Sequence, residues 1–147
     1  MTATNPFGAL LTAAALSSLS GGAASAQSVD RFDVVCEIAG RSVSRHDGVV
    51  TTDFTQTSRY TVDLTTGQFC NDCAEVVFEL RVPPTVTELN LTHAVWFEGR
   101  PAGFDQVFIV NRVTGRARYE LRVGAIEATG AGPCRRETFS GFPEAVF

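Results

Sequence analysis

Lysine is absent from the chain, and all 12 basic residues are arginine. A GC-rich genome produces this bias because lysine codons are AT-rich, so the bias is not in itself a sign of function. The short motifs of common enzyme classes are also absent: there is no G-x-S-x-G, H-E-x-x-H, P-loop or G-x-G-x-x-G. The only histidines, His46 and His93, lie far apart in the sequence. No group of residues therefore indicates catalysis, and we expect the protein not to be an enzyme.

Long apolar runs and an excess of positive charge are missing as well. Beyond the N-terminal segment, no stretch approaches the ~20 apolar residues of a membrane-spanning helix, so no membrane span is expected in the mature chain. The formal net charge of −4 argues against nucleic acid as a partner, because binding to phosphates needs clustered positive charge. No pattern in the sequence indicates a cofactor.

The N-terminal segment has the features of a secretory signal peptide. Residues 1–28 contain no charged side chain, and an apolar run from Ala9 to Leu19 is followed by small residues and the Ala24-Ser25-Ala26 sequence. An A-x-A sequence behind an apolar run too short to span a bilayer is typical of a cleavable export signal. The sequence therefore predicts a signal peptide over 1–26 and a single domain over 27–147, located in the periplasm or secreted.

Apolar and polar residues alternate with period two through most of the mature chain, which is typical of strands with one buried face. Regular alternation of this kind favours antiparallel strands with one wet face over buried parallel strands. VFIVN, at 107–111, is apolar on both faces and is expected to be a covered or central strand. The alternating segments are RFDVVCEI (31–38), SRYTVDL (58–64), EVVFELRV (75–82), TELNLT (87–92) with HAVWF (93–97), and RARYELRV (116–123).

Two turns have the same chemistry. YTVDLTTGQ (60–68) and FIVNRVTGR (108–116) align as aromatic-x-Val-Asx-x-x-Thr-Gly-polar. An Asx side chain can cap a turn, and a glycine in the left-handed region completes the common bulged hairpin, so Gly67 and Gly115 are predicted at positive φ. Pro83 and Pro84 separate two strands because neither can donate to a ladder. Gly130-Ala131-Gly132-Pro133 predicts a loop.

The C-x-x-C pair, Cys70 and Cys73, allows three interpretations. A redox centre needs a thiol with a lowered pKa, but Asp72 and Glu75 would raise it and the following segment is strand-like. A zinc site needs further ligands, and neither Cys36 nor Cys134 belongs to a second C-x-x-C pair. Both of these interpretations are disfavoured, and no metal is expected.

The third interpretation is a structural disulfide, which suits an exported protein with an even number of cysteines. Cys70 and Cys73 are close enough to pair across a tight turn. That leaves Cys36 in the first strand to pair with Cys134 near the C-terminus, and a closed antiparallel sheet can place its first strand beside its last. The sequence therefore predicts the bridges Cys36–Cys134 and Cys70–Cys73.

Several of these motifs together resemble a group of small exported β-sheet proteins from GC-rich Gram-negative bacteria. They are Cys36-Glu37, V-D-L-x-x-G-x-F-C at 62–70, N-R-x-T-G at 111–115, and the late cysteine before F-S-G-F-P at 139–143. The resemblance implies a β fold and export, and no activity. The stretch at 32–43 is also similar to the opening of periplasmic lysozyme-inhibitor barrels of the c-type family, whose Ser-Gly-x-x-Tyr loop this sequence lacks.

These observations lead to one expected fold and two expected functions. The fold is all-β, an antiparallel meander of about seven or eight strands that forms a small barrel or a strongly curled sheet stapled by disulfides. The first function is a non-enzymatic binding module for a small or apolar ligand, held in an aromatic-lined cavity. The alternative is a protein-interaction module, such as an inhibitor or an envelope assembly factor, which needs a filled core and an exposed patch.

Overall fold

A computed structural model describes residues 29–73 and 76–143 of the chain. The predicted signal peptide, 1–26, lies outside the described residues. The described part contains nine β-strands and no helix, so no helix there could cross a membrane. The strands are β1 (Arg31–Ser44), β2 (Val50–Asp63), β3 (Gln68–Asn71), β4 (Phe78–Glu79), β5 (Glu88–Asn90), β6 (His93–Phe97), β7 (Arg100–Asn111), β8 (Arg116–Val123) and β9 (Ile126–Glu137).

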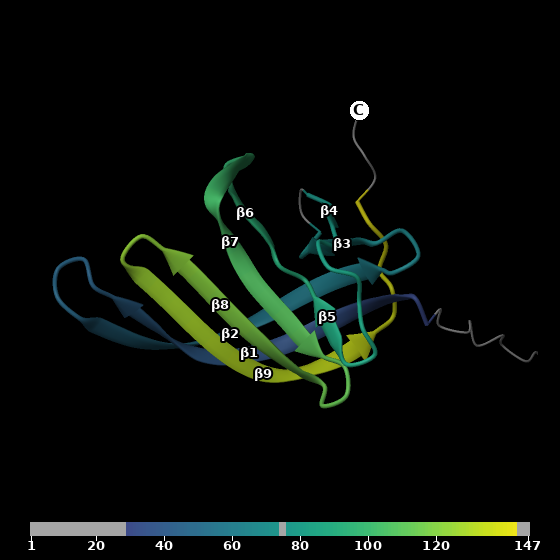
Figure 1. Cartoon of the computed structure of the whole chain (residues 1–147), viewed down its shortest axis with the longest axis horizontal. Coiled ribbons are helices and arrows are strands. Elements are labelled where there is room, and N and C mark those ends of the chain that lie inside the picture. The colour runs from purple at the N-terminus through teal and green to yellow at the C-terminus, as the bar shows by residue number, and fades with distance from the viewer. Residues whose placement is uncertain (1–28, 74–75, 144–147) are drawn as a thin grey trace, which may run out of the picture.

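All nine strands belong to one antiparallel sheet, which curls into a half-barrel (Figure 1). The strand order is β4-β3-β2-β1-β9-β8-β7-β5. The remaining strand, β6, also pairs with β7. The first strand, β1, lies beside the last, β9, with Cys36 directly opposite Cys134. The predicted all-β, strongly curled and disulfide-stapled sheet is confirmed.

Two segments differ from their predicted structure. Among the described residues of the alternating stretch, 76–82, only Phe78–Glu79 form a strand, which pairs with Gln68 and Phe69 of the four-residue strand β3. The predicted loop at 130–133 lies instead inside β9, where Gly130 pairs with Tyr119 of β8 and Gly132 with Ala117. Local turn chemistry favoured a loop there, and pairing on both sides of β9 overrides it.

Glycines in β9 allow a close approach to β1. A Cβ at Gly132 would overlap the main-chain carbonyl of Glu37, and one at Gly130 would press on the side chain of Ile38. Across the same contact, a Cβ at Gly40 would overlap the backbone of β9. The glycines of this segment therefore permit backbone-to-backbone contact where the sheet bends.

The inside of the curl is filled by side chains of the sheet itself. Tyr60, Phe69 and Phe108 are each 0% exposed, and the ring centroids of Tyr60 and Phe108 lie 4.6 Å apart. Smaller apolar side chains pack around these rings: Val34, Ile38, Val62, Leu89 and Leu91. The enclosed end of the half-barrel is therefore a packed core.

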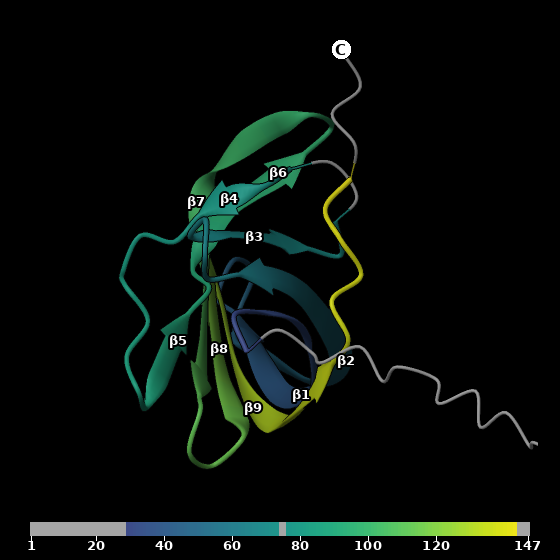
Figure 2. The same ribbon diagram turned by 90° about the vertical axis from the view of Figure 1, so that its right-hand side faces the viewer.

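The outer face of β1 is covered in part by the segment that follows β9. Asp33, a polar residue of the alternating stretch 31–38, is fully buried, and the main-chain N–H of Ser140 donates to its Oδ1 at 3.2 Å. Arg59 bridges two carboxylates, with Nη1 3.0 Å from Asp33 and Nη2 2.7 Å from Glu137. The C-terminal segment thus lies against β1 and β2 along one side of the sheet (Figure 2).

Candidate functional site

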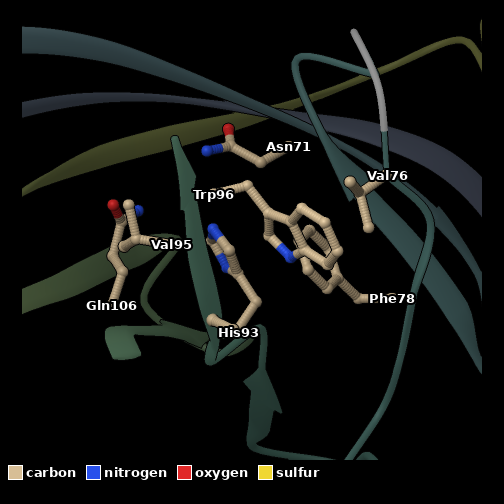
Figure 3. A pocket seen from close by; sticks show the side chains of 8 residues that line it. Asn71, Val76, Phe78, His93, Val95, Trp96 and Gln106 are labelled. Carbon is tan, nitrogen blue, oxygen red and sulfur yellow. The ribbon is translucent and has the colours of Figure 1, made fainter. Parts of the chain in front are cut away.

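The two ends of the sheet, β4 and β6, face each other across a cleft that we call the seam cleft. In the described part of the chain, β4 pairs only with β3 and β6 pairs only with β7, so the half-barrel is not closed between them. The cleft has a volume of about 200 Å³. Its lining comes from both sides of the opening: Asn71, Val76, Phe78, His93, Ala94, Val95, Trp96 and Gln106 (Figure 3).

Aromatic rings form the apolar part of the cleft. The ring of Phe78 stacks on that of His93, with centroids 4.7 Å apart and planes tilted by 38°. Trp96 comes from β6, and its indole also lines the cleft (Figure 3). It is 40% exposed, which leaves one of its surfaces open to a ligand. A neighbouring hollow of about 430 Å³ shares Phe78, His93 and Trp96 with the seam cleft, so these residues lie between the two hollows.

His93 is held in one orientation as a neutral ring. It is only 4% exposed, and its Nδ1 lies 2.9 Å from the main-chain oxygen of Leu91. Because a carbonyl oxygen only accepts, Nδ1 carries the proton and Nε2 is left as an acceptor. Burial lowers the pKa of His93 below its usual value, which outweighs the opposite effect of the bond to Leu91. The ring is therefore a neutral wall of the cleft with one acceptor nitrogen.

Asn71 provides the unusual polar group of the site. Its Oδ1 is buried and accepts no hydrogen bond from the described residues. Neighbouring polar groups are occupied, since Gln106 Nε2 donates to the hydroxyl of Tyr60 at 2.9 Å. Burial of Tyr60 raises its pKa, so the hydroxyl stays protonated. A buried acceptor without a donor costs about 1–3 kcal/mol, and a ligand donor that displaced its covering atoms and reached the oxygen would recover that cost.

An ion pair fixes the chain beside the cleft. Arg81 makes a bidentate contact with Asp105 of β7, with Nη2 3.1 Å from Oδ1. The Arg81 guanidinium holds the pKa of Asp105 below its usual range. The segment after β4 is therefore bound to β7, across the opening from β3. Both walls of the seam cleft are thereby held in place by contacts outside it.

The disulfide and turn residues predicted from the sequence lie away from this cleft or at its edge. Cys36 is joined to Cys134 and Cys70 to Cys73, and the described residues contain no free cysteine. Gly67 and Gly115 have φ of 70° and 64°. The short bridge closes the turn directly after Asn71, so it positions the cleft rather than lining it.

Both predicted turns have the expected side-chain caps. Asp63 Oδ1 accepts from the N–H groups of Thr65 and Thr66 at 2.9 and 3.2 Å. Asn111 Oδ1 accepts from Val113 and Thr114 in the same way, at 3.0 and 2.9 Å. These turns shape the sheet and do not contribute to the seam cleft.

The sequence indicated some cleft residues and missed others. In the alternating segments 87–92 and 93–97, His93 falls on the same face as Leu89 and Leu91, and all three are buried in the structure. His46 lies in an exposed turn, and no metal-binding group of three His, Cys, Asp or Glu residues occurs in 29–73 and 76–143. Asn71 was visible only as part of the C-N-D-C segment, and nothing in the sequence marked Gln106.

Protein-family models, curated proteins and solved structures give no match to this chain.

Proposed function

We propose that the protein is a non-enzymatic binding module whose seam cleft takes a small, largely apolar ring carrying a hydrogen-bond donor. The observation that carries this proposal is a cleft lined by the rings of Phe78, His93 and Trp96, with Asn71 at its edge, whose buried Oδ1 accepts no hydrogen bond from the described residues. Apolar walls with a few convergent polar groups are typical of small-molecule sites. The acceptor at Asn71, together with Nε2 of His93, favours a donor on the ligand. The volume of about 200 Å³ favours a ligand of one or two rings.

Indole and 1-methylindole are matched probes, because only indole carries an N–H donor. We expect indole to bind saturably, with NMR shift changes at the Trp96 indole N–H and the Asn71 side-chain amide. Loss of the donor should weaken binding by about fivefold, the value of roughly one hydrogen bond. That difference should vanish in Asn71→Ala, because the acceptor is gone.

The stacking contribution is tested by a pair of neighbouring aromatic residues. Trp96→Ala should weaken indole binding by about threefold to tenfold, as expected for the loss of an aromatic contact. Phe97→Ala is the control, since Phe97 is 70% exposed and does not line the cleft. Equal effects of the two variants, or shift changes scattered over the surface, would contradict the proposal.

A protein-interaction module is the second candidate function, favoured by the exposure of Phe97 at the tip of the β6–β7 hairpin. Glu98 and Gly99 form the two-residue turn there, both at positive φ, and present Phe97 and Trp96 at the end of an edge strand. An exposed aromatic side chain on an unpaired strand edge can anchor a partner protein. Under this alternative, Phe97→Ala would impair binding to the partner as much as Trp96→Ala does.

Export to the periplasm or the exterior is part of the proposal. Two disulfides in the described part support an oxidising compartment, since such bridges are rare in reducing ones. The mature chain is then expected to begin at Gln27, after Ala26. Intact-mass measurement of protein from the periplasmic fraction tests this, and retention of residues 1–26 would contradict it.

A further inference from the structure

Strand β2 has a long edge that no other strand covers. It pairs with β1 along its whole length, but with β3 only over Tyr60–Asp63. Just before that range, the main-chain oxygen of Arg59 accepts from the N–H of Asp72 at 2.9 Å. Over 50–58, the edge therefore has no strand partner among the described residues, and the β1–β2 hairpin extends away from β3 there (Figure 1). We call this segment the β2 edge.

The main-chain groups of β2 point alternately to β1 and away from it. The N–H of Leu64 donates to Asp30 on the β1 side, whereas the oxygen of Arg59 points to the side of β3. The register between β1 and β2 contains no bulge, so this alternation continues along the whole strand. The outward groups of the β2 edge therefore belong to its odd-numbered residues: Thr51, Asp53, Thr55 and Thr57.

The other edges of the sheet are protected against pairing with another chain, and the β2 edge is not. β4 and β5 are two and three residues long, and β6 has a shift of register against β7. Short or bulged edge strands resist association with other strands. The β2 edge, VTTDFTQTS, is longer, contains no proline and has Asp53 as its single charged residue. A long, regular edge with little charge is a template for a further strand.

The space beside the β2 edge is open. Val50 is 61% exposed, and the odd-numbered residues of the edge are all exposed. A hollow of about 310 Å³ beside the edge is lined by 37–39 of β1 and 55–57 of β2. No other described segment lines that hollow, so another strand can approach there.

The β2 edge is complementary to a second copy of itself. Two antiparallel strands related by a two-fold axis run past each other in reverse order, and the register that uses all of 50–58 places Phe54 opposite Phe54. Thr55 of one copy then lies opposite Asp53 of the other, and Thr51 opposite Thr57. These are the residues with outward main-chain groups, so about eight hydrogen bonds can form. That number is close to the about ten of a typical protein interface.

The side chains that meet in this register are compatible. Phe54 is on the concave face, where it packs edge-on against Tyr119 with ring centroids 5.9 Å apart, so its ring is already positioned. On the opposite face, the carboxylate of Asp53 can accept from the hydroxyl of Thr55 in the second copy. The two Asp53 side chains are diagonal neighbours across the axis, and each is paired with Arg41 of its own copy, with Nε 3.0 Å from Oδ1.

We propose that two copies of this chain associate through the β2 edge, antiparallel about a two-fold axis at Phe54, and form one continuous sheet. A second copy fits this edge because it has the same length, brings ring against ring, and places a threonine hydroxyl opposite the only carboxylate. The contact consists mainly of main-chain hydrogen bonds over a small area, so we expect a weak dimer with a Kd of about 10–100 μM. This inference is independent of the seam cleft, which lies between β4 and β6.

Sedimentation velocity of the purified protein measures the association. We expect a monomer at about 1 μM and mainly a dimer at about 1 mM, concentrations on either side of the expected Kd. Amide hydrogen exchange locates the contact. The N–H of Thr55 points outward, so its exchange should slow as the protein concentration rises. The N–H of Phe54 points to β1, so its exchange should not depend on concentration.

Variants of Thr55 test both the edge and the register. Thr55→Pro removes an outward N–H and leaves the ladder with β1 intact, so this variant should be monomeric at every concentration. Thr55→Lys places a cation opposite Asp53 of the second copy and should tighten the dimer by about threefold to tenfold. Thr55→Glu places like charges there and should weaken the dimer by a similar factor. Thr129→Lys is the matched control and should change nothing, because Thr129 is exposed on β9, which is paired on both sides.

Three outcomes would overturn the proposal. They are a protein that remains monomeric at about 1 mM, a dimer that persists in Thr55→Pro, and equal or reversed effects of Thr55→Lys and Thr55→Glu. Trp96→Ala should leave the dimer unchanged and weaken only indole binding, so failure at the β2 edge is distinguishable from failure at the seam cleft. Thermal unfolding at a concentration where the wild type is monomeric verifies that each variant is folded.

Discussion

Asp63 and Asn111 close two turns by the same hydrogen bonds, but the surroundings of the two residues differ. Asp63 is 1% exposed, and Arg31 Nε lies 2.7 Å from its Oδ2. Burial alone would raise the pKa of Asp63; hydrogen bonds from Thr66 and Arg31 outweigh burial and lower it. The buried turn can therefore contain the charged Asp63 because Arg31 pairs with it. The exposed turn contains the neutral amide of Asn111 at the same position. One turn chemistry is thus adapted to two environments.

The glycine that ends each turn is the residue on which the hairpin depends. Gly67→Val and Gly115→Val should each lower the free energy of unfolding by about 1–2 kcal/mol, because both glycines adopt the left-handed region, which is costly for a β-branched residue. Urea titration measures this change. Thr66→Val is the control, as Thr66 is exposed and uses only its main-chain N–H in the turn. If all three variants had the same midpoint, the turn assignment would be wrong.

His93 should make stability fall in mildly acidic solution. Its pKa is lowered in the folded protein from an ordinary 6.5, so the unfolded chain takes up a proton first as the pH falls. The contribution of neutral His93 to the free energy of unfolding is therefore complete above pH 6.5 and is lost as the pH falls below that value. The ring packs against Tyr60, Phe69 and Phe78, and Arg81 and Asp105 are the nearest charges acting on it.

Urea titrations at pH 7 and pH 5 test this effect. We expect the loss of stability between the two values to be smaller in His93→Phe than in the wild type, although the variant itself can be less stable at both. His46→Gln should keep the wild-type loss, because His46 is exposed in a turn. The carboxylates with lowered pKa values, such as Glu137, lose their contribution only at lower pH, since their ordinary pKa is 4.5 or below. A wild-type loss in His93→Phe would contradict the assignment.

At the scale of elements, the close contact between β1 and β9 depends on the absence of a side chain at Gly132. Gly132→Ala should destabilise the protein by about 1–3 kcal/mol, because its Cβ would overlap the Glu37 carbonyl in a contact that neither backbone can easily relax. Ala131→Val, one position away on the exposed face, should change stability by no more than about 0.5 kcal/mol. Thermal or urea unfolding compares the two. A larger loss in Ala131→Val would mean that the strands are less close than described.

Long-range contacts explain both differences between the predicted and the observed strands. The glycines and proline of 130–133 have poor strand propensity, but their small size is what the bend between β1 and β9 needs. The described residues 76–82 alternate well, but only Phe78–Glu79 pair with the short strand β3, and Arg81 beyond them binds Asp105 of β7. Local periodicity therefore predicted which residues face the core, and long-range contacts decided which of them pair.

At the scale of the whole molecule, the seam cleft exists because the sheet does not close. Of the aromatic residues in the second half of the sequence, Trp96 lines this cleft. Phe108 is in the core, whereas Trp96 and Phe97 are exposed. The sequence could not indicate this difference, since it depends on which strands become the ends of the sheet. That follows from strand order, which is set by pairing between distant segments.

The two disulfides act on very different lengths of chain, and their effects on stability should differ accordingly. Cys36–Cys134 spans a sequence separation of 98 and joins the first strand to the last, whereas Cys70–Cys73 spans 3. In the chain-entropy view, such bridges contribute about 4–5 and about 1–2 kcal/mol. Cys36 is also fully buried among core side chains, so a serine there would bury a hydroxyl. We therefore expect Cys36→Ser/Cys134→Ser to lose several-fold more unfolding free energy than Cys70→Ser/Cys73→Ser.

Urea titration of the two double variants, with the oxidised wild type as reference, measures this difference. The local pair should instead affect the seam cleft, because Cys70 and Cys73 bracket Asn71 and fix the turn that places its buried oxygen. Indole binding should therefore weaken in Cys70→Ser/Cys73→Ser under conditions where both variants are folded. If Cys70→Ser/Cys73→Ser lost as much unfolding free energy as Cys36→Ser/Cys134→Ser, the turn at Cys70–Cys73 would stabilise the core as well as the cleft. Under that result, a redox or metal role for the C-x-x-C pair would need a direct test.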